Sequence, residues 1–137
     1  MYAMNMKGGA FIYQKTSAKD VFVPEDFSEE QLMIKEMILD FVYQEVTPNL
    51  EKLDSMTDKS LMPSVLKKSG ELGMMGVNIS EELGGMDLDM VTTLIFGETT
   101  AHGHAFATAI GAHTSIGSLP IVYYGTDAQK EQYLPGL

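Results

Sequence analysis

Apolar residues recur at spacings of three and four along most of this chain, and no stretch alternates apolar with polar positions as a half-buried strand would. The clearest stripe consists of Ile34, Met37, Ile38, Phe41 and Val42. This periodicity predicts an amphipathic helix with one face on a core. Pro48 is expected to end or kink that helix near Val46, because proline lacks a backbone donor and clashes with the preceding turn.

Three signals mark the start of this first helix. Ser28 and Gln31 have the spacing of a capping box, in which each side chain accepts a hydrogen bond from the other residue's backbone N–H. Phe27 and Leu32 occupy the positions of a hydrophobic staple, and Glu29 favours the positive end of the helix dipole. The helical part of the chain is therefore expected to begin at about residue 26.

Further helices are predicted from apolar spacing over residues 61–72, 91–103, 105–116 and 119–123, and from Thr126 to the residue before Pro135. Residues 51–59 are interpreted as a polar connection. Residues 73–85 carry four glycines and no helical period, so they predict a loop that packs on the core. Asp87 or Asp89 is then expected to cap the next helix. The predicted fold class is all-α.

The first part of the chain has a different character. Residues 1–25 sustain no helical period and are predicted to form an extended arm, whereas residues 26–137 are predicted to form one helical domain. The arm contains four apolar residues that are expected to order it against the body: Phe11, Ile12, Phe22 and Val23.

Small side chains gather on one predicted helix, at Ala105, Ala107, Ala109, Gly111 and Ala112. A helix that removes bulk from its own surface leaves room for another occupant. That occupant is either a neighbouring helix packed closely or a ligand that lies along the helix. Both interpretations stay open at this point.

Composition narrows the possible partners. A chain of 137 residues is long enough for one domain with its own core. Its formal net charge of −10 argues against nucleic acid or an anionic membrane as a partner, because both attract basic surfaces. We expect no apolar run of membrane-spanning length and no secretory signal. The absence of Cys fits a reducing compartment, so a cytoplasmic location is expected.

The three histidines are the first candidates for metal or acid–base chemistry. His102 and His104 stand two positions apart, which on a helix places them on different faces. Glu98 and His102 stand four apart, whereas the di-iron helical motif uses a spacing of three and needs further carboxylates. We interpret them as a pair on a partly exposed helix face. The chain itself is expected to hold no metal site and no catalytic residue.

Three segments together resemble the N-terminal helical domain of acyl-CoA dehydrogenases. They are EELGG at residues 81–85, GAHTSIG at residues 111–117 and YGTDAQKEQYLP at residues 124–135, in the family's order and at about its spacing. The GAHTSIG segment is most similar to the very-long-chain branch. The resemblance covers the chain from about residue 27 to its end, and it departs from the family at Asp87 and Asp89, where the family has glycines.

The resemblance implies a parent enzyme that uses FAD to oxidise fatty acyl-CoA to trans-2-enoyl-CoA in fatty acid β-oxidation and passes the electrons to an acceptor. In that family a β-domain and a C-terminal helical domain hold the FAD and the catalytic glutamate. This chain is therefore expected to be an incomplete part that binds no FAD and is inactive alone. A homo-oligomer is also expected.

The family's N-terminal domain helps to wall the tunnel for the acyl tail. By alignment of the motifs, the positions that line this tunnel are Thr108, Ala109, Ala112 and Ile116, with Gly111 beside them. Thr108, Ala112 and Ile116 are also spaced so that they share one face of a helix, as a lining requires.

Other functions stay open at the level of sequence. Acyl-CoA oxidases and flavin monooxygenases share this domain with the dehydrogenases. A stand-alone helical binding or interaction module derived from the same fold is the alternative to an enzyme. A reading frame that continues past residue 137 into a β-rich segment would favour the enzyme.

Overall fold

The computed structural model describes residues 9–137 of the chain. Over those residues the chain is helical throughout and contains no strand, which confirms the all-α prediction. The α-helices are α1 (Glu29–Phe41), α2 (Leu50–Asp54), α3 (Leu61–Glu71), α4 (Met90–Thr100), α5 (Ala105–Ala112), α6 (Leu119–Tyr124) and α7 (Asp127–Tyr133).

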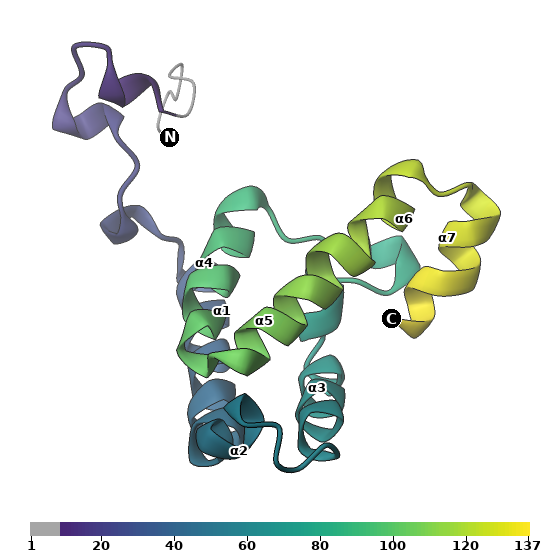
Figure 1. Ribbon diagram of the computed structural model, residues 1–137. Helices are drawn as coiled ribbons and strands as arrows, with labels where there is room; N and C mark the ends of the chain where they lie inside the picture. Colours follow the sequence, from purple (N-terminus) through teal and green to yellow (C-terminus); the bar gives the residue numbers. More distant parts are fainter. Residues whose placement is uncertain (1–8) are drawn as a thin grey trace.

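The core lies where α1 packs along α4 and α5 crosses both (Figure 1). The rings of Phe41 and Phe106, from α1 and α5, are 5.7 Å apart at its centre. The buried cluster around them consists of Ile38, Val42, Val46, Leu53, Val65, Met74, Val77, Phe96 and Ile110. Each of these side chains contributes about 1.5–3 kcal/mol through burial. The core therefore fixes α5 by one of its faces.

The boundaries of α1 confirm the sequence prediction. The Ser28 Oγ accepts a hydrogen bond from the Gln31 backbone N–H at 3.1 Å, and the Gln31 Oε1 accepts one from the Ser28 N–H at 3.0 Å. After α1 the chain continues as a π-helical turn, Val42–Val46, and then as a 3-10 turn that contains Pro48. The regular helix thus ends before the proline, as expected.

The segment predicted as a polar connection is wrong in its first half, where the short helix α2 forms. Leu53 is only 2% exposed and joins the core, while its neighbours on α2 face solvent. One buried leucine in a charged stretch is too weak a period to predict a helix. Tertiary packing decides the structure here.

The glycine-containing loop packs on the core as predicted, with Met74, Val77 and Ile79 buried. Gly84 has a φ of +87°, in the left-handed region that other residues avoid. Gly85 is needed for a different reason, because a Cβ there would lie 2.0 Å from the Ile79 carbonyl oxygen. Asp89 then caps α4 by accepting a hydrogen bond from the Thr92 N–H at 2.9 Å. The loop brings these residues to one end of α4.

The described part of the predicted arm, residues 9–27, stands away from the helical body in Figure 1. It is made of three 3-10 turns, Ala10–Ile12, Ala18–Asp20 and Pro24–Asp26. The four apolar residues that were expected to order it against the body are all exposed: Phe11, Ile12, Phe22 and Val23. That expectation is wrong for the chain as it stands.

The helical stretch Ala105–Tyr124, from α5 through α6, is 20 residues long with a mean hydropathy of 1.3. By length and composition alone it is apolar enough to cross a membrane, so the expectation that no run approaches that length is wrong. A single helix of this kind is weak evidence for a span, because core helices of other proteins pass the same test. Since only 22% of the stretch is buried in this chain, most of it lies outside the core.

Candidate functional site

One face of the long helical stretch belongs to the core. Phe106, Ile110, Thr114 and Ser118 follow one another at every fourth position, and all are buried. The Thr114 hydroxyl donates to the Ile110 carbonyl oxygen at 3.0 Å, which satisfies its polar group inside the helix. This face holds α5 in place, so the opposite face is fixed in direction.

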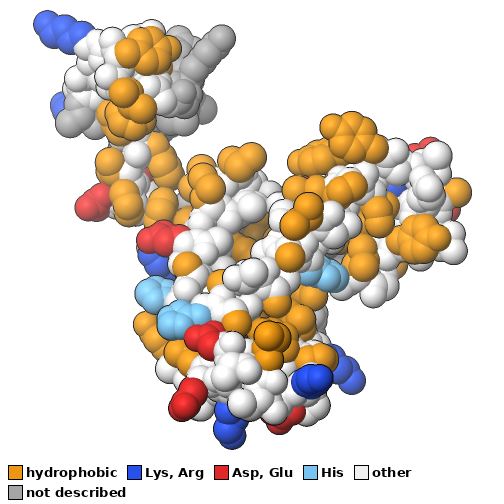
Figure 2. Space-filling model, viewed as in Figure 1, with side chains coloured by type: hydrophobic (Ala, Val, Ile, Leu, Met, Phe, Trp, Pro, Cys, Tyr) orange, Lys and Arg blue, Asp and Glu red, His pale blue; other side chains and the backbone are white. Residues whose placement is uncertain are grey.

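The opposite face carries the residues predicted to line an acyl-tail tunnel. Thr108, Ala112 and Ile116 are exposed, and Ile116 is 77% exposed, while Ala109 and Gly111 are half-buried beside them. A Cβ placed on Gly111 would meet no heavy atom of the described residues within 4 Å. Close helix packing within this part of the chain therefore does not explain the small residues at positions 111 and 112. Figure 2 shows this stretch on the surface, with hydrophobic side chains along it.

The helix changes its winding at the end of this face, which the sequence did not predict. Residues His113–Gly117 form a π-helical turn. The Asn78 Nδ2 donates to the Thr114 carbonyl oxygen at 3.1 Å, and the Ser118 hydroxyl donates to the His113 carbonyl oxygen at 2.7 Å. Such turns are rare and are frequent at functional sites. Asn78 was the only signal available, as a polar residue within a buried apolar loop segment.

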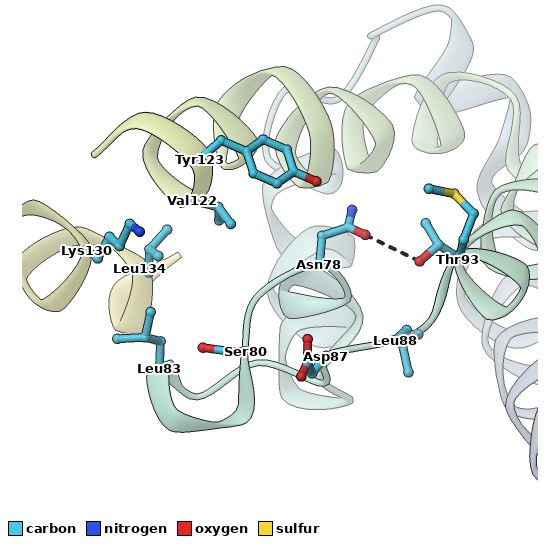
Figure 3. Close-up of a pocket in the computed structure, with 11 residues that line it drawn as sticks. Asn78, Ser80, Leu83, Asp87, Leu88, Thr93, Val122, Tyr123, Lys130 and Leu134 are labelled. Carbon is cyan, nitrogen blue, oxygen red and sulfur yellow. Dashed lines mark hydrogen bonds between the residues drawn. The ribbon is translucent and has the colours of Figure 1, made fainter. Parts of the chain in front are cut away.

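A cavity of about 340 Å³ opens between the glycine-containing loop, the start of α4, and α6 with α7. Its lining consists of Asn78, Ser80, Leu83, Asp87, Leu88, Met90, Thr93, Val122, Tyr123, Lys130 and Leu134. Figure 3 shows the Tyr123 hydroxyl directed towards Asn78, whose Oδ1 accepts a hydrogen bond from the Thr93 hydroxyl at 3.3 Å. These groups suit an apolar chain with a polar end.

Sequence reasoning missed the whole cavity lining. Its polar members come from three separate segments, and each has an ordinary local role that hides it. Asp87 lies in a turn with a φ of +47°, and Lys130 lies on the amphipathic helix α7. The five predicted tunnel residues are not part of this lining.

The histidines have separate roles in the structure. The His102 ring lies 6.4 Å from the Tyr43 ring, and no ion pair joins it to Glu98, so the predicted pair does not form between these described residues. The His113 Nε2 is buried and has no hydrogen-bond partner among the described residues. Across residues 9–137, no three His, Asp or Glu side chains are grouped so that they would hold a metal ion.

Asp54 joins α2 to the start of α5. Its Oδ2 accepts a hydrogen bond from the His104 Nδ1 at 3.0 Å, and its Oδ1 accepts one from the Ala105 N–H at 3.1 Å. These two hydrogen bonds, the His104 bond foremost, lower the pKa of Asp54 below its ordinary value of 3.8. Since both contacts hold the beginning of α5, they fix the helix that carries the predicted site.

Comparison with known proteins identifies the family. Residues 28–137 match the family "Acyl-CoA dehydrogenase, N-terminal domain". The chain belongs to this family. A probable acyl-CoA dehydrogenase of Bacillus subtilis is 37% identical over 131 residues, which are 96% of this chain and 22% of that protein. Other curated acyl-CoA dehydrogenases are 28–34% identical over 80–85% of the chain.

Two solved structures share the fold of this acyl-CoA dehydrogenase domain. A Bacillus anthracis acyl-CoA dehydrogenase complexed with FAD is 43% identical, with a TM-score of 0.85 over 94% of this chain and 22% of that chain. A structure described as the electron transferring flavoprotein of Acidaminococcus fermentans is 29% identical, with a TM-score of 0.70 over 82% of this chain and 30% of that chain. The chain thus spans less than a third of the length of the relatives that it matches.

Proposed function

We propose that this chain is part of a flavin-dependent enzyme that oxidises fatty acyl-CoA to trans-2-enoyl-CoA, and that its α5 face walls the pocket for the acyl tail. The observation that carries the proposal is the exposed stripe of Thr108, Ala112 and Ile116 on a helix whose other face is buried. A stripe with small residues at its centre leaves room for a hydrocarbon chain, and the long apolar stretch supplies a surface for one.

The proposal divides the chemistry between this domain and the rest of the parent enzyme. When bound, FAD would accept the hydride that leaves the β-carbon of the substrate. Residues 9–137 show no complete site for it, since the cavity has only Lys130 as a cation to meet a diphosphate. We assign the flavin site and the proton-abstracting carboxylate to other parts of the parent. This domain excludes water from the tail and positions it.

The charge of the domain supports the same division. A net charge of −10 disfavours contact with the phosphates of CoA, whereas the α5 face is uncharged. The domain would therefore meet the apolar end of the substrate. We also infer that the parent is a homo-oligomer and passes electrons to an electron-transferring flavoprotein, a protein class named in the Acidaminococcus structure.

Turnover by the complete reading frame tests this proposal. The purified full-length protein is incubated with acyl-CoA esters of increasing length and an artificial electron acceptor, and products are weighed by mass spectrometry. We expect products two hydrogens lighter than the substrates, and no such product from the isolated 137-residue chain. A full-length protein that removes hydrogen from no acyl-CoA, or an isolated chain that does so, would contradict the proposal.

A further inference from the structure

The arm, residues 9–27, is built from local interactions. Its turns are closed by backbone hydrogen bonds such as Ile12 N–H to the Gly9 carbonyl at 3.0 Å and Asp26 N–H to the Val23 carbonyl at 2.8 Å. Ser17 and Asp20 add a capping box to the middle turn. Short 3-10 turns are marginal by themselves, so a persistent shape requires packing against another surface.

The apolar side chains of the arm face solvent in this chain. Ile12 is 78% exposed and Tyr13 is 75% exposed at the first turn, and Phe11 beside them is 52% exposed. Phe22 packs on Phe27 with ring centroids 5.8 Å apart and is itself 41% exposed. So many large apolar groups on a short segment indicate a surface that another part of a protein covers.

The comparisons separate relatives that share the arm from relatives that lack it. The family match begins at residue 28, and residues 28–137 number 110. The first Bacillus subtilis relative matches 131 residues, so at least 21 matched residues precede Ser28. The Bacillus anthracis structure covers 94% of the chain, so it too includes most of the arm. The arm is therefore a shared feature of these two proteins.

These two relatives are also the longer ones. Since 131 residues make up 22% of the Bacillus subtilis protein, it has about 600 residues. The curated relatives that match only 80–85% of this chain do so over 26–29% of their own length, which makes them about 380–450 residues long. The arm thus accompanies an additional region of about 150–200 residues.

We propose that the arm is a docking segment whose apolar side chains pack on the additional region of the same subunit in the full-length parent enzyme. The proposal rests on the proposed function, because it takes this chain as the beginning of such a parent. It explains why the arm keeps its place relative to the body in the Bacillus anthracis structure, where the superposition includes it. It also explains why the shorter relatives match without it.

Photo-crosslinking in the full-length enzyme tests the proposal. Tyr13 is replaced by benzoylphenylalanine, and Tyr43, which is 55% exposed and lies outside the arm, is replaced in a matched control. After irradiation, cross-linked peptides are identified by mass spectrometry. We expect the Tyr13 position to cross-link to a peptide of the additional region within one subunit, and the Tyr43 position not to do so.

A second measurement uses hydrogen exchange on Ile12→Asp, with Met56→Asp, at a position 73% exposed outside the arm, as the control. We expect amides of the cross-linked region to exchange at least tenfold faster in the Ile12 variant and unchanged in the control. A Tyr13 cross-link to another subunit, to residues 28–137 or to nothing would overturn the proposal, as would a full-length protein without an additional region. Reduction of the bound flavin by acyl-CoA, measured on the same preparation, reports separately on the proposed function.

Discussion

Replacing Ala112 by Phe distinguishes a wall for the acyl tail from a helix contact. Ala112 is exposed on α5, and the neighbouring Gly111 has open space where a Cβ would be. A phenyl ring at position 112 therefore enters the space that we assign to the substrate and not the core. The stability of the 137-residue chain should change by less than about 1 kcal/mol, whereas overpacking would cost about 1–3 kcal/mol.

The effect on catalysis should depend on the length of the substrate. Each methylene kept out of the pocket forfeits about 0.8 kcal/mol of apolar burial, which is about a fourfold loss in kcat/KM. Short acyl chains that end before position 112 should react as in the unmodified enzyme. Beyond that length, the loss should grow with each added carbon until the tail no longer enters.

The assay is kcat/KM against acyl length for the full-length Ala112→Phe enzyme. Ala128→Phe, which makes the same change at an exposed position on α7, serves as the control and should leave the profile unchanged. An equal loss at every length, together with a lower melting temperature, would refute the assignment of this face to the substrate. A loss with the control variant as well would show that the effect is not local.

Further substitutions test the structure in pairs, each by urea unfolding of the 137-residue chain. Ile110→Ala should cost about 2–5 kcal/mol because Ile110 is 0% exposed, while Ile116→Ala on the open face should cost less than about 1 kcal/mol; similar costs would contradict the two-faced helix. Gly85→Ala should destabilise strongly, since its Cβ would meet the Ile79 carbonyl oxygen, whereas Gly111→Ala should stabilise α5 by up to about 1 kcal/mol; the reverse order would be inconsistent with the loop geometry. The Asp54 carboxylate has a pKa below its ordinary value in the folded chain, so its contribution is present above pH 3.8 and is lost as the pH falls through the lowered pKa. Asp54→Asn should therefore lose less stability on acidification below pH 3.8 than the unmodified chain, and an unchanged acid slope would show that the bonds to His104 and Ala105 do not matter.

Local signals predicted most helix boundaries because the groups that decide them are close in sequence. The capping box at Ser28 and Gln31 requires only four consecutive residues, and it forms as expected. Thr126 caps α7 in the same way. The buried face of α5 also follows from its own period, since Phe106 and Ile110 are the larger residues on that helix.

Features that depend on distant residues could not be predicted. The short helix α2 exists because Leu53 reaches a core assembled from other helices. The π-helical turn depends on Asn78, which is 36 positions before Thr114 in the chain. The cavity likewise requires the loop and α7 to meet. The tunnel assignment for Thr108, Ala109, Gly111, Ala112 and Ile116 came from the family resemblance and stays a prediction.

Anaerobic titration of the full-length protein with acyl-CoA tests the central claim most directly. Bound flavin absorbs visible light in its oxidised form, and transfer of a hydride from the substrate bleaches that band without any added acceptor. We predict that the purified full-length enzyme is yellow and is bleached by a fatty acyl-CoA, while the isolated 137-residue chain is colourless. A full-length protein that binds no flavin, or whose flavin stays oxidised with acyl-CoA of every length, would contradict the account.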